Sequence, residues 1–320
     1  MTRRKKTPPR KKRKPIPKSK TSATKGRSDP FLLEQGSLSD LQAAKRKVRQ
    51  IIEYHWSYYS ELAYQRKAIE PEISRILNEA SFSDFSFKGW QRSVKYKYGL
   101  HPFSTLGSLN DPGGRFNIGD INPQAIPTFP ALYLAYDKDT ALQETLGQVE
   151  VPGSDLSSQD IALTSSGSIT IFSVSGHLDK VFDVRKAKNL KKFVDLIKKF
   201  KLSKQLIGIA RQLGEPLPDL IAKSSILHKN LQEPGWRNWP MRFDIPSASQ
   251  IFGQLVFFAG IEGILYKSKL TGKDCLAIYP DNFEKSDSYI ELDDDPPSSK
   301  VPTRMDSSNW KVSCKNFNEL

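Results

Sequence analysis

PALYLAYDKDTALQETL, residues 130–146, is the stretch from which the architecture is most readily inferred. PALYLAY has the continuous apolar character of a buried strand. Asp137 or Asp139 then supplies a helix cap, and the residues that follow predict a short helix closed by Gly147. A buried strand followed directly by a capped helix indicates that this region mixes both kinds of element.

The chain on either side of this stretch repeats that mixture. Residues 85–126 are rich in Gly, Asn, Asp, Ser and Pro, which predicts strands joined by functional loops. Apolar periodicity predicts a long helix that starts at Ser39 or Asp40 and ends before Pro71, and further helices over 72–80, within 186–232 and over 248–260. Further strands are predicted at SITIFSVSG (168–176), KVFDV (180–184), EGILYKS (262–268) and CLAIYP (275–280).

We therefore predict an α+β fold, in which mixed sheets with flanking helices follow a helical N-terminal segment. The expected divisions are a disordered basic arm (1–30), a helical region (31–84), the main domain (85–284) with a helical insertion (186–232), and a C-terminal tail (285–320).

Positive charge is concentrated at the start of the chain. Residues 1–28 contain 13 Lys and Arg and no Asp or Glu, and subtracting these 13 from the formal net charge of +14 leaves +1 for the rest. This arm suits contact with nucleic acid, with an acidic partner, or with water alone, and it lacks the aromatic residues that stack on bases. The basic balance is thus no evidence for a nucleic-acid-binding surface on the folded part.

Cysteine and hydropathy patterns place limits on cofactors and compartment. Cys275 and Cys314 are too few for a disulfide framework and have no His or Cys neighbours of the kind that bind zinc. The longest apolar run, LVFFAGIEGILY, is too short to span a bilayer. We expect a soluble, cytoplasmic protein without a metal and without a membrane partner.

Three blocks, GGRFN (113–117), PALYLAYDKDTALQETL (130–146) and GILYKSKLTGKDCLAIYP (263–280), occur in that order. Together they resemble the RES domain, the toxin of RES/Xre-type toxin-antitoxin systems, which is related to ADP-ribosyltransferase toxins. The Arg, Glu and Ser for which the family is named correspond to Arg115, Glu144 and Ser268. Phe116 stands where the family more often has Trp, and Lys267 and Lys269 flank the Ser, so no phosphate contact is assigned to these lysines.

The resemblance implies that NAD is the substrate and that the bond between nicotinamide and ribose is broken. Glu144 would stabilise the oxocarbenium-like ribose, while Arg115, in a turn opened by Gly114, would bind phosphate through two parallel hydrogen bonds. Tyr133 would stack on nicotinamide and Ser268 would contact the ribose or help to place the acceptor, because phenol and hydroxyl groups suit those contacts. Arg92 is a second candidate phosphate ligand.

Three functions stay open on this basis. The first is an NAD glycohydrolase or phosphorylase that acts as a toxin, with a helix-turn-helix (Xre-type) antitoxin as its partner. The second is an ADP-ribosyltransferase that modifies a protein or nucleotide, since any nucleophile held nearby can trap the same ribose cation. The third is a non-enzymatic regulator that binds nucleic acid through the arm. The long helix from about residue 41 suits an oligomer contact, an antitoxin contact or internal packing.

Overall fold

The computed structural model describes residues 38–146, 168–218, 220–296 and 298–315. Contacts within the chain divide it into two units, residues 1–49 and 50–320. The described part of the first unit is the opening of helix α1 (Leu38–Ala68), and the seven strands and the remaining described helices belong to the second. Within the described ranges, no helix combines the length and the apolar character that crossing a membrane requires.

One seven-stranded sheet organises the described part of the second unit, in the order β1-β2-β5-β4-β3-β6-β7. Strand β1 also pairs with β3, so β1, β2, β5, β4 and β3 form a closed hydrogen-bonded circuit. The β3–β4 pair is parallel, whereas the other pairs are antiparallel. The strands are β1 (Phe82–Lys95), β2 (Leu132–Ala135), β3 (Ile169–Asp183), β4 (Gly263–Lys267), β5 (Asp274–Ile278), β6 (Tyr289–Leu292) and β7 (Arg304–Asp306).

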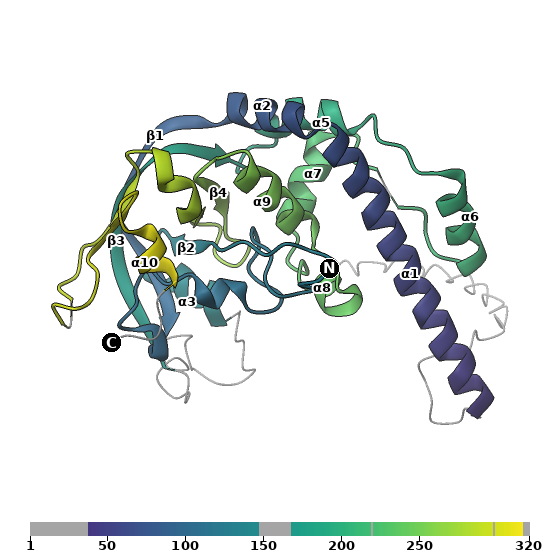
Figure 1. Cartoon of the computed structure of the whole chain (residues 1–320), viewed down its shortest axis with the longest axis horizontal. Helices are drawn as coiled ribbons and strands as arrows, with labels where there is room; N and C mark the ends of the chain where they lie inside the picture. Colours follow the sequence, from purple (N-terminus) through teal and green to yellow (C-terminus); the bar gives the residue numbers. More distant parts are fainter. Residues whose placement is uncertain (1–37, 147–167, 219, 297, 316–320) are drawn as a thin grey trace, which may run out of the picture. The chain divides into compact units, whose positions relative to one another are not determined.

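Helices α2, α5, α7 and α9 contact one another and lie together beside the sheet (Figure 1). The described α-helices besides α1 are α2 (Glu70–Ala80), α3 (Lys138–Leu146), α5 (Lys191–Ile197), α6 (Lys204–Leu213), α7 (Ser224–Leu231), α8 (Asn238–Phe243), α9 (Ala248–Phe258) and α10 (Trp310–Lys315). Short 3-10 turns occupy Tyr96–Tyr98, Leu106–Leu109, Ala187–Leu190 and Pro280–Lys285. The α+β prediction is confirmed.

Two apolar cores lie on opposite faces of the central strands. Along β2, Leu132 and Leu134 join a core built mainly from the strands themselves, whereas Tyr133 and Ala135 face the core that includes α2, α5, α7 and α9. This alternation is the period of two that a strand imposes on its side chains. It directs Tyr133 toward the helical side.

Two segments differ from the sequence-based description. SITIFSVSG and KVFDV form one continuous strand, β3, rather than two. Gly176 does not interrupt it, because the glycine serves close packing: a Cβ atom there would lie 2.8 Å from a ring carbon of Phe87. Within 285–320, β6 pairs with β3 and β7 pairs with β6, so this segment extends the sheet.

Candidate active site

The GGRFN loop is held in place by Tyr133 and Asn117. Gly113 has φ +89°, a conformation that favours glycine, and a Cβ on Gly114 would overlap the ring and hydroxyl of Tyr133. The Tyr133 hydroxyl donates to Asn117 Oδ1 at 2.9 Å and accepts from the Phe116 N–H at 3.0 Å. Asn117 Oδ1 also accepts from the Gly114 N–H at 2.8 Å. The only proton of the phenol is therefore committed to the loop.

The far side of this loop is anchored in the core. Asn117 is fully buried, and its amide nitrogen donates to the carbonyls of Ser108 at 2.7 Å and Phe129 at 3.1 Å. Phe116 is also fully buried, and its ring centroid lies 5.0 Å from that of Tyr266. The aromatic residue expected at position 116 is thus a core residue in this chain.

Arg115 projects from the loop toward the end of α7. Its Nη1 donates to the carbonyls of Glu233 at 3.0 Å and Leu231 at 3.4 Å, and its guanidinium carbon lies 6.0 Å from the ring centre of Trp236. It pairs with no carboxylate in the described part of the chain, and its Nε and Nη2 donate to no described residue. Several donors of a fixed cation are consequently available to an anion.

Glu144 and Ser268 meet across 124 residues of sequence. Helix α3, whose first turn is capped by the Asp137 carboxylate, carries Glu144, and the turn after β4 carries Ser268. The Ser268 hydroxyl donates to Glu144 Oε1 at 2.6 Å and accepts from the N–H groups of Leu270 at 3.1 Å and Thr271 at 3.2 Å. Ser268 is only 2% exposed. Its one proton fixes the orientation of the carboxylate, whose other lone pairs accept from no residue that the structure describes.

Arg115 and Glu144 share one electrostatic environment, which also includes Tyr133 and Arg237. Burial is the largest cause of the raised pKa of Tyr133; the charges of Arg115 and Arg237 oppose it and that of Glu144 adds to it. Desolvation and then Arg115 lower the pKa of Arg237, while Glu144 acts in the other direction. Burial raises the pKa of the Cys275 thiol; the charge of Glu144 raises it further and that of Arg115 lowers it. The structure thus brings together the four side chains at 115, 133, 144 and 268.

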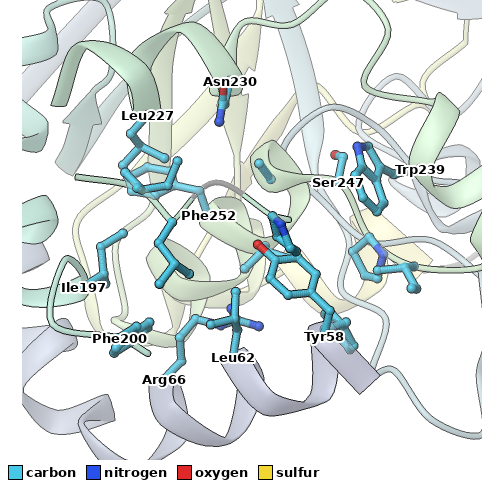
Figure 2. A pocket seen from close by; sticks show the side chains of 18 of the residues that line it. Tyr58, Leu62, Arg66, Ile197, Phe200, Leu227, Asn230, Trp239, Ser247 and Phe252 are labelled. Atoms are coloured by element: carbon cyan, nitrogen blue, oxygen red, sulfur yellow. The ribbon is translucent and has the colours of Figure 1, made fainter. Parts of the chain in front are cut away.

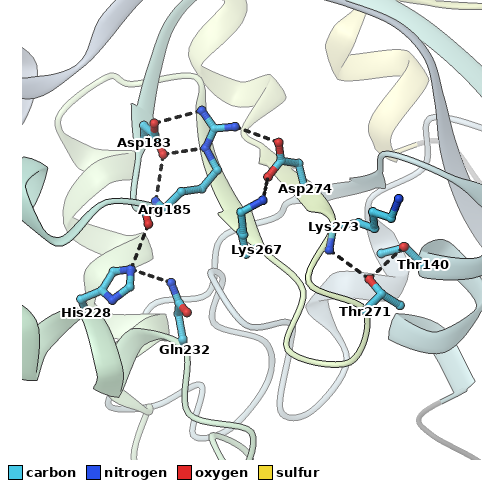
Figure 3. A network of polar contacts seen from close by, with 9 residues as sticks. All are labelled: Thr140, Asp183, Arg185, His228, Gln232, Lys267, Thr271, Lys273 and Asp274. Atoms are coloured by element: carbon cyan, nitrogen blue, oxygen red, sulfur yellow. Dashed lines mark hydrogen bonds and ion pairs between the residues drawn. The ribbon is translucent and has the colours of Figure 1, made fainter.

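Figure 3 shows polar contacts of Lys267 and Asp274, the two residues that lie on either side of the turn that carries Ser268. Asp274 on β5 accepts from Lys267 at 2.9 Å and from Arg185 at 2.8 Å, and Arg185 also pairs with Asp183. The Asp183 hydrogen bond is the largest cause of the raised pKa of Arg185.

The helix α3 is joined directly to the same turn. Thr140 and Thr271 exchange a hydrogen bond of 2.9 Å between their hydroxyls (Figure 3). Since Thr140 is one helical turn before Glu144, this contact fixes the helix beside the serine that orients its carboxylate.

Arg92 lies apart from this group. It belongs to the strand-built side of β1, where its Nη2 donates to the Ser104 carbonyl at 2.6 Å and its Nη1 to the Tyr133 carbonyl at 3.4 Å. Its Nε is buried with no hydrogen-bond partner among the described residues, and burial lowers its pKa to about 10. Arg92 contacts the main chain of Tyr133, not its ring.

Sequence reasoning missed three residues of this region: Asn117, Trp236 and Arg237. Asn117 stands inside the GGRFN block, but nothing in a lone Asn indicates that it bonds a tyrosine 16 residues away. The guanidinium carbon of Arg237 lies 4.5 Å from the Trp236 ring centre. An aromatic–Arg pair in the Gly- and Pro-containing stretch EPGWRNWP was the available indication. Within the described residues, no three His, Cys, Asp or Glu side chains gather as metal ligands do.

Comparisons with known proteins give a match to a protein family and a match to a solved structure. A family model described as the RES domain matches residues 90–297. The comparison with curated proteins gives no match. A chain in the crystal structure of the M. tuberculosis MbcT–MbcA toxin–antitoxin complex is 13% identical; the match covers 75% of this chain and 94% of that one, with a TM-score of 0.39.

Proposed function

The chain belongs to the RES-domain family, and from that premise we propose that it is an NAD-consuming toxin that breaks the bond between nicotinamide and ribose. The observation that carries this proposal is that a hydrogen bond fixes the orientation of the Glu144 carboxylate. Glu144 accepts a 2.6 Å hydrogen bond from a buried serine and lies in the same electrostatic environment as the unpaired cation Arg115.

The reaction suits a site of this kind. The glycosidic bond breaks with its electron pair going to the cationic nicotinamide nitrogen, which becomes neutral, and the ribose carbon becomes an oxocarbenium ion. A leaving group that is already cationic needs no strong acid. The catalyst must instead stabilise positive charge on the ribose, which one fixed carboxylate does.

Each residue then has a role that follows from its contacts. Glu144 has free lone pairs to accept hydrogen bonds from ribose hydroxyls and to stabilise the developing cation. Arg115 has free donors for the phosphate oxygens, and Arg237 adds positive charge beside it. For Ser268 we propose a positioning role, because its proton is used on Glu144. Tyr133 holds the loop of Arg115 and presents its ring beside the site, and Arg92 is left out of the proposed site.

Incubating the purified protein with NAD and following nicotinamide release tests this proposal. We expect Glu144→Gln to lower kcat by about 100-fold or more with KM nearly unchanged, because it removes charge that acts in the transition state. Glu284→Gln, which changes an exposed carboxylate on the turn after β5, is the matched control. No nicotinamide release by the wild-type chain, or an active Glu144→Gln, would refute the proposal.

The acceptor of the ribose is decided by product analysis. Water gives ADP-ribose and a proton, phosphate gives ADP-ribose phosphate, and transfer leaves adenylate label on a macromolecule. We propose consumption by water or phosphate, with transfer as the alternative that label on protein or nucleic acid would establish.

An antitoxin partner is part of the same proposal and rests on membership of the RES-domain family. Expression of the chain alone should deplete cellular NAD and stop growth, and co-expression of a helix-turn-helix protein from the adjacent gene should restore both. Growth arrest that persists in a Glu144→Gln strain would separate toxicity from NAD chemistry.

A further inference from the structure

A cavity of about 580 Å³ lies on the helical side of the second unit (Figure 2). Its walls come from the later turns of α1 and from α5, α7, α8 and α9 with the loops between them. Glu233 and Trp236, which contact Arg115, line one part of it, whereas neither Glu144 nor Ser268 does. The volume falls within the roughly 300–1,000 Å³ range of small-molecule sites.

Most of the lining is apolar. Leu62, Ile197, Trp239 and Phe252 surround the space from helices α1, α5, α8 and α9, and Phe200 joins them from the segment after α5 (Figure 2). A wall of this composition suits an aliphatic or aromatic group, and it offers little to a sugar or a nucleotide phosphate.

One cation faces this apolar space. Figure 2 shows Arg66 and Tyr58 extending into it from the same helix, α1. The Arg66 guanidinium lies 5.8 Å from the ring centre of Tyr59 and pairs with no carboxylate in the described part of the chain. Desolvation lowers the pKa of Arg66, in keeping with a charge withdrawn from water without a counter-ion. An anion inside the cavity would relieve that cost.

Two buried polar atoms on the same helix also lack partners. Tyr54 Oη and His55 Nδ1 are buried and form no hydrogen bond with any described residue, and both residues line the cavity. Tyr54 is only 2% exposed. Buried polar groups are normally paired, so orphaned atoms beside a cavity point to a polar ligand atom. Positions 54, 58, 62 and 66 recur every four residues, so one face of α1 presents both the donors and the apolar side chains.

We propose that this cavity binds an amphipathic monoanion, a molecule with an apolar body and a single carboxylate that pairs with Arg66. A single anionic group is inferred because Arg66 is the one guanidinium among the residues that line the cavity, which also include the carboxylate of Glu233. A small molecule accounts for the observations better than a docked protein surface, because the unpaired atoms of Tyr54 and His55 are buried. The proposal does not depend on NAD chemistry.

Titration of the full chain with dodecanoate, followed by calorimetry and by the fluorescence of Trp236 and Trp239, tests the proposal. We expect saturable binding of one dodecanoate per chain. Arg66→Met should bind about tenfold more weakly or worse, the effect of losing a charge-assisted hydrogen bond. Lys67→Met is the matched control: it removes the neighbouring cation of α1, which is exposed and pairs with Glu70, and should leave affinity within about twofold.

Three further comparisons separate charge from shape. 1-Dodecanol should bind wild type about tenfold more weakly than dodecanoate, because it lacks the charge. Arg66→Lys should retain most of the affinity, because it keeps the charge. Arg66→Gln, which also removes the charge, replaces Arg66→Met if the latter fails to fold by circular dichroism. Saturating NAD should not displace dodecanoate.

The opposite results overturn the proposal. These are absence of saturable binding by wild type, equal affinities of Arg66→Met and wild type, and equal binding of alcohol and acid. Displacement by NAD would assign the cavity to the dinucleotide site instead.

Discussion

Replacing Ser268 with Ala separates the orientation of Glu144, the proposed catalytic carboxylate, from its presence. The substitution removes the 2.6 Å hydrogen bond to Glu144 while leaving that carboxylate in the chain. A hydrogen bond to a charged group contributes ~1.5–3 kcal/mol. If that contribution is realised mainly in the transition state, kcat falls by about 10- to 150-fold, since 1.36 kcal/mol corresponds to tenfold in rate.

The same substitution also weakens the turn after β4. Ser268 accepts hydrogen bonds from the N–H groups of Leu270 and Thr271, and both lose this acceptor. We expect the free energy of unfolding to fall by about 1–3 kcal/mol. A loss of stability alone would lower the amount of active enzyme without changing the kinetics of the folded fraction.

Ser288→Ala is therefore the decisive control. It removes a buried serine hydroxyl that donates to Glu262 at 2.6 Å and accepts from the Asp179 N–H at 2.8 Å, and it does not touch Glu144. Steady-state kinetics at fixed active-enzyme concentration should show a lower kcat with little change in KM for Ser268→Ala, and a nearly normal kcat for Ser288→Ala. Equal losses in the two variants, or a Ser268→Ala kcat within twofold of wild type, would refute the positioning role.

Three other outcomes are expected. Gly114→Ala should destabilise the protein by about 1–3 kcal/mol and reduce NAD turnover, because the new methyl group overlaps Tyr133; urea denaturation and kinetics measure both effects. Arg115→Met should raise KM for NAD about tenfold, whereas Arg92→Met, whose guanidinium bonds only main-chain carbonyls, should leave KM within about twofold. Burial lowers the pKa of His55 below its ordinary 6.5, so the unfolded chain binds the proton more tightly than the folded chain. The contribution of neutral His55 to stability is therefore complete above pH 6.5 and is lost as the pH falls through the folded-state pKa. Urea midpoints measured from pH 8 to 5 should fall less for His55→Phe than for wild type.

Local patterns predicted local structure well. The strand at 130–136 and the helix after it were inferred from an apolar run and an Asp, and the cap is present as a 2.9 Å bond from the Thr140 N–H to Asp137. The long helix before Pro71 and the helix after Ser247 follow the same logic, because capping and periodicity act over a few residues.

Long-range pairing could not be predicted in the same way. Strand β6 exists because residues 289–292 find the exposed edge of β3 more than a hundred residues away, and its own four-residue pattern is too short to indicate a strand. The strand end predicted at Gly176 is wrong for a similar reason. This glycine makes room for the ring of Phe87, which is far away in the sequence. The domain boundaries proposed from composition stay predictions, and the basic arm (1–30) and Gly147 lie outside the described residues.

The four side chains identified from the family resemblance are of two kinds: in two of them the hydroxyl proton already bonds within the protein, and in the other two hydrogen-bonding groups remain for a ligand. The hydroxyl of Tyr133 donates its proton to Asn117, and the hydroxyl of Ser268 donates its proton to Glu144. Among the described residues, Arg115 has donors and Glu144 has acceptors without a partner, and these match the acceptors of a pyrophosphate and the donors of a ribose. A sequence motif therefore joins two kinds of residue: substitution of Arg115 or Glu144 should remove contacts with the substrate, whereas substitution of Tyr133 or Ser268 should act by displacing the residues that make those contacts.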